Sequence, residues 1–173
     1  KEQKQKLAQF FGAKRWIFNH FLHENKQRFL NQENHLSVYD ANNIITELKK
    51  QPDTSWLKQV DDWCLKHASE DLGNAYQQFF NSLKGKRKGP KVQAPKFKNK
   101  HSRQSYRTRG VKINIDSGTV FLPKLKNVKC VLHRAFTGNI KPATVSKDPS
   151  DKYYVSILVE EEIKLLSSTR REV

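Results

Sequence analysis

Two Cys-x-x-His pairs have residue types and a spacing that could hold a metal ion: Cys64 with His67, and Cys130 with His133. Zinc in proteins is bound by such thiolates and imidazoles. In a helix, residues i and i+3 share a face, so the first pair could converge, whereas in a strand the second pair should diverge. Cys64 also belongs to an apolar helical stripe, where a buried structural thiol is usual. The sequence therefore predicts no metal site.

Three clusters of carboxylates could in principle hold a catalytic divalent metal: Asp61-Asp62, Glu70-Asp71 and Glu160-Glu161-Glu162. The first cluster begins a predicted helix, where acidic residues offset the helix dipole. The second has Lys66 one turn before Glu70, as in an ordinary exposed ion pair, and the third ends a predicted strand. No phosphate-binding glycine loop, nucleophile elbow or Cys/His catalytic pair appears. We predict no catalytic residue in this chain.

Cations carry the strongest chemical signal. The 173 residues hold 33 Lys plus Arg against 17 Asp plus Glu, a net charge of +16, and such an excess favours a polyanionic partner. Nucleic acid is the first candidate and an anionic membrane surface the second. Residues 84–109 contain no acidic residue, and their basic residues are Lys84, Lys86, Arg87, Lys88, Lys91, Lys96, Lys98, Lys100, Arg103, Arg107 and Arg109.

Aromatic residues interrupt this basic arm at Phe97 and Tyr106. Lysines can contact phosphates, arginines can contact phosphates or base edges, and the two rings could stack on bases or anchor the arm to the fold. A charge run is often a solvated linker. The prolines and aromatic residues within this one favour an arm that is docked on the fold and contacts nucleic acid.

The elements that position these residues change in kind along the chain. Apolar residues at helical spacing predict a first helix ending near Leu30, a second beginning after an N-cap at Ser37, and a third from Asp61 to about Leu83. Short strands follow, at 111–115, 119–122, 128–132, 140–146 and 153–160, the first two joined by an Asp-Ser-Gly turn. The predicted class is α+β, with a small barrel as its second part.

No stretch approaches the roughly 18 apolar residues needed to span a bilayer, and no signal-peptide pattern appears at the start. The two cysteines cannot staple a fold of this size, so a reducing compartment is favoured. Both ends of the sequence look cut, because it opens without Met and closes abruptly at Val173.

Several segments together resemble the TnpB family of transposon-encoded relatives of type V CRISPR effectors. They are Phe11–Asn19, Leu48–Lys50, Thr54–Leu57, Asn74–Phe80, Ala94–Lys100, Ser105–Thr108, Phe121–Leu125 and Asp151–Ser156. Their order and spacing over almost the whole chain carry the resemblance. The chain departs from the family pattern in a longer, more basic stretch at 85–94, and in lacking the barrel strand expected before Lys1.

The resemblance implies a helical recognition domain (1–83) inserted into a wedge-type β-barrel (111–163), with the basic arm (84–110) between them. Residues 164–173 would be a linker toward an RNase H-like nuclease domain that is absent from this chain, where magnesium, zinc and the catalytic carboxylates are expected. Expected partners are guide RNA and target double-stranded DNA, without membrane, in the nucleoid-associated cytoplasm of a bacterium or archaeon. Guide pairing would read the sequence, and the protein would read a flanking DNA motif.

Two groups of residues are candidates for these contacts. Those predicted to contact the flanking DNA motif are Tyr39, Asn42, Asn43, Lys66, Ser105, Tyr106, Arg107, Thr108 and Arg109. Those predicted to contact RNA or DNA phosphates are Lys14, Arg15, Lys84, Lys96, Lys98 and Lys100. The leading hypothesis is the nucleic-acid-binding half of an RNA-guided DNA endonuclease. The alternatives are a nuclease-dead, guided or direct DNA-binding repressor, and an RNA-binding protein of ribosomal type.

Overall fold

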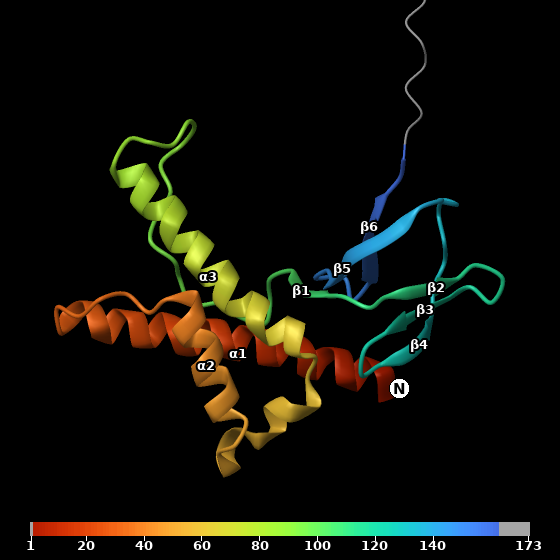
Figure 1. Cartoon of the computed structure of the whole chain (residues 1–173), viewed down its shortest axis with the longest axis horizontal. Helices are drawn as coiled ribbons and strands as arrows, with labels where there is room; N and C mark the ends of the chain where they lie inside the picture. The colour runs from red at the N-terminus through yellow and green to blue at the C-terminus, as the bar shows by residue number, and fades with distance from the viewer. Residues whose placement is uncertain (1, 163–173) are drawn as a thin grey trace, which may run out of the picture.

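A computed structural model describes residues 2–162. Helices occupy the first half of the chain and strands the second, so the predicted α+β class is confirmed (Figure 1). The helical segments are α1 (Glu2–Leu30), α2 (Val38–Leu48), the 3-10 helix η1 (Pro52–Gln59) and α3 (Asp62–Leu83). The strands are β1 (Gln104–Thr108), β2 (Lys112–Asn114), β3 (Thr119–Leu122), β4 (Lys126–Lys129), β5 (Asn139–Lys147) and β6 (Tyr153–Glu160).

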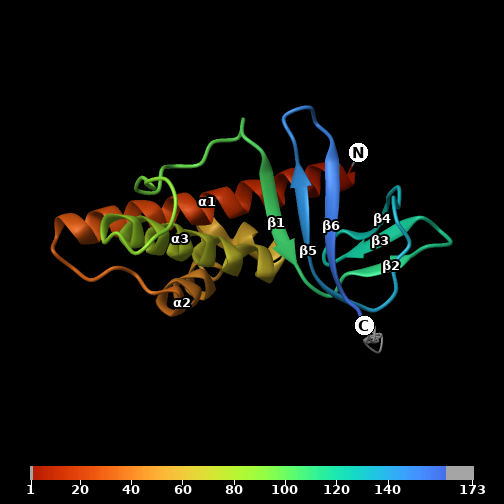
Figure 2. The same cartoon turned by 90° about the horizontal axis from the view of Figure 1, so that it is seen from above.

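Helix α1 is the longest element and links the two halves of the molecule. Its apolar stripe, which includes Phe10, Ile17 and Phe21, is buried against the other helices. Near its start, Leu7 belongs to the same buried core, and the Gln3 amide donates to the Asn127 carbonyl oxygen of β4 at 2.7 Å. Helix α1 therefore runs from the helical half to the strands (Figure 2), and β1 also contacts the start of α3.

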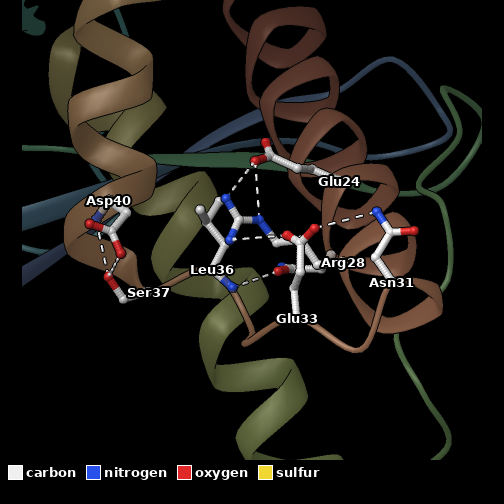
Figure 3. A network of polar contacts seen from close by, with 8 residues as sticks. Glu24, Arg28, Asn31, Glu33, Leu36, Ser37 and Asp40 are labelled. Carbon is white, nitrogen blue, oxygen red and sulfur yellow. Dashed lines mark hydrogen bonds and ion pairs between the residues drawn. The ribbon is translucent and has the colours of Figure 1, made fainter.

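The turn between α1 and α2 is fixed by polar contacts (Figure 3). Arg28 lies within 3.4 Å of Glu24 and 3.9 Å of Glu33, while the backbone N–H of Leu36 donates to the Asn25 side chain at 2.8 Å. Ser37 then caps α2 by accepting from the backbone N–H of Asp40 at 3.1 Å, which confirms the predicted cap. The direction of α2 is thus set before its first turn.

Helix α3 begins as predicted, with Asp61 as its N-cap. Cys64, Ala68 and Leu72 are buried, but the stripe does not stay buried to the end of the helix, where Leu83 is 68% exposed. The predicted core face is therefore wrong for the last turns. They extend beyond the neighbouring helix α2 (Figure 1), and their contacts are with the loop before α2 and with the arm.

The strands form two antiparallel sheets, ordered β1-β5-β6 and β2-β3-β4. A closed barrel needs every strand to be paired on both sides, and in the part of the chain described here β1, β6, β2 and β4 are each paired on one side. The predicted barrel is not present as a closed one. Instead, apolar side chains from both sheets, among them Val120, Val145 and Val155, line a shared cavity.

Two local predictions about the strands meet different outcomes. The predicted hairpin at 111–122 is confirmed as β2 and β3. Pro142 lies within β5, at the shift in register between Ile140 and Ala143, where it does not need to donate a hydrogen bond to β6. The predicted bounds of the basic arm, 84–110, however, include residues that belong to the sheet. Residues 104–108 form β1, because β5 supplies their hydrogen-bond partners. The predicted linker 164–173 lies outside the described residues.

Candidate nucleic-acid interface

The basic arm is docked on α1, as the proline and aromatic pattern predicted. The side-chain amide of Asn19 donates to the Lys98 carbonyl oxygen at 2.9 Å and accepts from its N–H at 2.8 Å. The Lys98 ammonium lies 3.8 Å from the centre of the Phe18 ring, and Lys26 lies 4.5 Å from the Phe97 ring. Cation–π contacts and a paired backbone group thus hold the arm against the helix.

Docking brings four of the predicted residues around one open pocket, formed by α1, α3, the arm and β1. Lys14, Arg15, Lys98 and Ser105 line it together with Arg103. Arg15 donates to the Gln104 side chain at 2.8 Å, and Arg103 lies 3.4 Å from the Ser146 hydroxyl. An arginine has five N–H donors, so both guanidinium groups keep donors for an anion. This basic pocket has the chemistry of a phosphate site.

The cations of the basic pocket are not equivalent. Lys14 is buried and its ammonium pairs with the Asp71 carboxylate at 2.7 Å, so part of its charge is already compensated. Burial of the Lys98 ammonium against the protein, with Lys14 nearby as a second cause, lowers the pKa of Lys98. A phosphate bound beside Lys98 would raise its pKa again, because a nearby negative charge favours the charged ammonium.

The predicted residues of α2 and α3 lie along and beside the line where these two helices meet. The Ser69 hydroxyl on α3 lies 3.2 Å from the Asn42 side chain on α2. The same hydroxyl donates to the Lys66 carbonyl oxygen, one turn earlier on α3, at 2.7 Å. Tyr39 is 75% exposed and Asn43 is exposed as well. The predicted contact role of these side chains remains a prediction, and their exposure is compatible with it.

Arg109 joins these residues from the end of β1. Its guanidinium group lies 4.0 Å from the ring centre of Trp63, which is one turn before Lys66 on the same helix. Stacking on an indole orients a guanidinium while leaving its N–H edge free to bind. Trp63 is therefore a positioning residue that the sequence analysis did not single out.

Two predicted contact residues are core residues instead. Tyr106 is 1% exposed and packs edge-on against Phe10 and Phe11, with ring centres 5.5 and 5.7 Å away. Thr108, also 1% exposed, donates to the Asp61 carboxylate at 2.6 Å. The predicted DNA contacts of these two side chains are incompatible with this structure, because alternate residues of a strand face opposite sides and these two face the helices.

The remaining predicted residues are at the surface. Arg107 is exposed, and it pairs with Thr144 in the ladder, on the side of the sheet away from Tyr106. Lys84, Lys96 and Lys100 are exposed along the arm. Sequence analysis missed Arg103 and Asn19 as site residues. Arg103 could have been found from its place in the acid-free run. Asn19 lies in one of the segments that carry the family resemblance, but no local pattern pointed to its contact with Lys98, 79 residues away.

In the part of the chain that the structure describes, no three His, Cys, Asp or Glu side chains come together as metal ligands. Cys64 is fully buried, and this burial raises the pKa of its thiol well above the ordinary range. A neutral buried thiol is a poor zinc ligand. The carboxylates of residues 2–162 likewise form no cluster of three that would suit a catalytic metal centre. No helix among the described residues has the length and apolarity that a membrane span requires.

Fold and surface together define a basic α+β module with the chemistry to bind a polyanion. Residues 1–34 match the sequence profile of a helix-turn-helix domain found in OrfB proteins of IS605 elements. In this structure the matched range holds α1 and the turn after it, with α2 following directly.

Two relatives extend the match to nearly the whole chain. The chain is 28% identical over 163 residues to InsQ of Escherichia coli K12, named as a candidate RNA-guided DNA endonuclease. It is 26% identical over 176 residues to a protein of Streptomyces pristinaespiralis with the same type of name. These alignments cover 94% and 99% of this chain, but 38% and 42% of the relatives. The chain is thus similar to the N-terminal region of OrfB/TnpB proteins, and it spans about two fifths of the length of the relatives that it matches.

Proposed function

We propose that this chain is the nucleic-acid-binding part of an RNA-guided DNA endonuclease. In this role it holds the guide RNA and the guide–target heteroduplex, and it reads a short DNA motif beside the target. The observation that carries the proposal is the docked basic arm, because it gathers Lys98, Arg103 and Arg15 at one pocket. The names of the two relatives supply the guided, endonucleolytic character.

The chemistry of the two surfaces supports different roles for them. The basic pocket offers charge and donors without a shaped slot for a base, which suits sequence-independent contact with a phosphate backbone. The side with Asn42, Lys66 and Arg109 offers amide and guanidinium groups, which suit the edges of bases in a duplex groove. Cleavage would fall to carboxylates and metal ions, with a zinc motif, in the portion of the family proteins that this chain does not span.

The test is to purify the protein expressed from its own locus and to sequence the RNA that comes with it. A discrete RNA with a constant scaffold and a variable end is expected. A random cellular mixture, or no RNA, would refute the guided function. Incubating the complex with DNA that matches the variable end then separates two readings: cleavage identifies a nuclease, whereas binding without cleavage identifies a repressor.

A further inference from the structure

An exposed aromatic cluster lies at the far end of the helical half, away from the basic pocket. The rings of Tyr76 and Phe80 on α3 are nearly parallel, with an angle of 19° between them and centres 6.1 Å apart. His35, from the loop before α2, sets its ring edge-on against both, at 4.0 Å from Tyr76 and 6.1 Å from Phe80. Phe80 is 41% exposed, so the cluster presents an aromatic surface to solvent.

The cluster forms the floor of an open groove between α3 and the loop at 35–38. The loop is held in place by the Asn25 contact with Leu36 and by the Ser37 cap, and so His35 is positioned before any ligand arrives (Figure 3). Across the groove, Gly73 lets the loop approach closely, since a Cβ there would lie 3.0 Å from the Val38 side chain. Burial lowers the pKa of His35, so near neutral pH the imidazole is uncharged and packs as a ring.

Polar groups along the same stripe of α3 surround the aromatic floor. Asn74, Gln77 and Asn81 place side-chain amides beside it, and Lys84 closes one end. Glu70, whose carboxylate lies 2.6 Å from the His67 ring, also lines the groove, about four turns before Lys84 on α3. Amides of this kind donate to and accept from the edges of nucleobases, adenine above all. Lys84 begins the acid-free arm, and the Arg87 side chain folds back onto α3 by donating to Gln78 at 3.2 Å. The groove thus joins aromatic rings, amides and cations within a few turns.

We propose that this groove binds an unpaired nucleobase of the bound nucleic acid, which stacks on Phe80 and Tyr76 while Lys84 contacts its phosphate. The inference rests on the proposed function, since it needs a nucleic acid on the protein. A protein partner would suit an apolar groove without flanking charge. Here the amides, Lys84 and the adjacent acid-free run give complementarity to a polyanion and favour a nucleic acid.

Ultraviolet crosslinking of the native protein–RNA complex, followed by tryptic digestion and mass spectrometry, tests the proposal directly. The stretch from His67 to Lys84 contains no internal lysine or arginine, so trypsin releases Tyr76 and Phe80 in one peptide. A nucleotide adduct on that peptide, at either ring, is expected.

A variant makes the test quantitative. Phe80→Leu keeps apolar bulk but removes the aromatic face, and one lost stacking contact is worth roughly 5- to 160-fold in affinity. The matched control is Phe29→Leu, because Phe29 is 80% exposed and lies outside the groove. A several-fold loss in RNA affinity for Phe80→Leu alone supports the proposal.

If Phe80→Leu retains RNA binding in full and the 67–84 peptide carries no adduct, the groove does not bind a nucleobase. The proposed function would remain intact in that case. A protein partner lost in the Phe80→Leu variant, with RNA unaffected, overturns the groove proposal as well. If the wild-type protein carries no nucleic acid at all, the proposed function itself is refuted. The experiment therefore distinguishes failure of the groove proposal from failure of the proposed function.

Discussion

Neutralising the basic pocket should change the salt dependence of binding, not only its strength. Each phosphate contact to duplex DNA contributes about 0.9 to the slope of log K against log salt. Of the pocket's cations, Arg15, Lys98 and Arg103 have no carboxylate partner in the described structure, whereas Lys14 is paired with Asp71. Replacing these three with Gln should therefore lower the slope by about 2.7, which is three contacts at about 0.9 each.

The magnitude can be stated as a ratio of affinities. Between 50 and 200 mM salt, one phosphate contact weakens binding about 3.5-fold, so three contacts account for about 40-fold. The assay is a filter-binding or anisotropy titration of the protein with a DNA duplex at several salt concentrations. The wild-type protein should lose about 40 times more affinity over this range than the triple variant does.

Two controls separate the pocket from general charge. Replacing the exposed lysines Lys58, Lys129 and Lys152 with Gln removes the same charge elsewhere on the surface. This control should leave the slope of log K against log salt close to that of the wild-type protein. Asp71→Asn frees the Lys14 ammonium and should raise the slope by up to about 0.9. Equal slopes in the wild-type protein and the pocket variant would refute our reasoning, because the pocket would then make no phosphate contact.

Three further predictions concern stability and pH. Thr108→Val removes the hydrogen bond to the buried Asp61 carboxylate and should cost about 1.5–3 kcal/mol in urea unfolding, with an unchanged m value. Gly138→Ala should cost about 1–3 kcal/mol, because Gly138 has φ 104° and a Cβ there would overlap the Glu160 carbonyl oxygen. Burial lowers the pKa of His20 and of His35, so the unfolded chain binds more protons and thermal stability should fall as pH drops below about 6.5.

Each of these has a matched comparison. Thr46→Val, at an exposed helix position, should change stability by less than half the cost of Thr108→Val. Gly12→Ala lies in α1 with its nearest contact at 3.9 Å and should be neutral or stabilising, unlike Gly138→Ala. A double His20→Gln, His35→Gln variant should flatten the pH profile between pH 7 and 5. An unchanged profile would mean that neither imidazole resists protonation in the folded state.

Predictions that rest on patterns of a few neighbouring residues are confirmed, because the interactions that produce these structures are between residues close in sequence. The stripe of α1, the Ser37 cap, the start of α3 and the β2–β3 hairpin depend on residues a few positions apart, and each is present where predicted. The acid-free run at 84–109 likewise predicted a polyanion-binding surface before any fold was considered, and its binding role stays a prediction. Helix periodicity, capping and net charge are properties that a single segment carries by itself.

Tertiary structure alone decided which residues of the predicted site reach the surface. Tyr106 and Arg107 are neighbours in the same basic-aromatic motif, yet one is buried against Phe10 and the other is exposed, because β5 draws the segment into a sheet. Lys14 and Lys98 meet at one pocket only because Asn19 fixes the arm 79 residues away along the chain. Such outcomes depend on contacts between distant segments. The side of a strand that is buried, and the partners of each side chain, are determined by the segments packed against them, and a local sequence pattern does not contain this information.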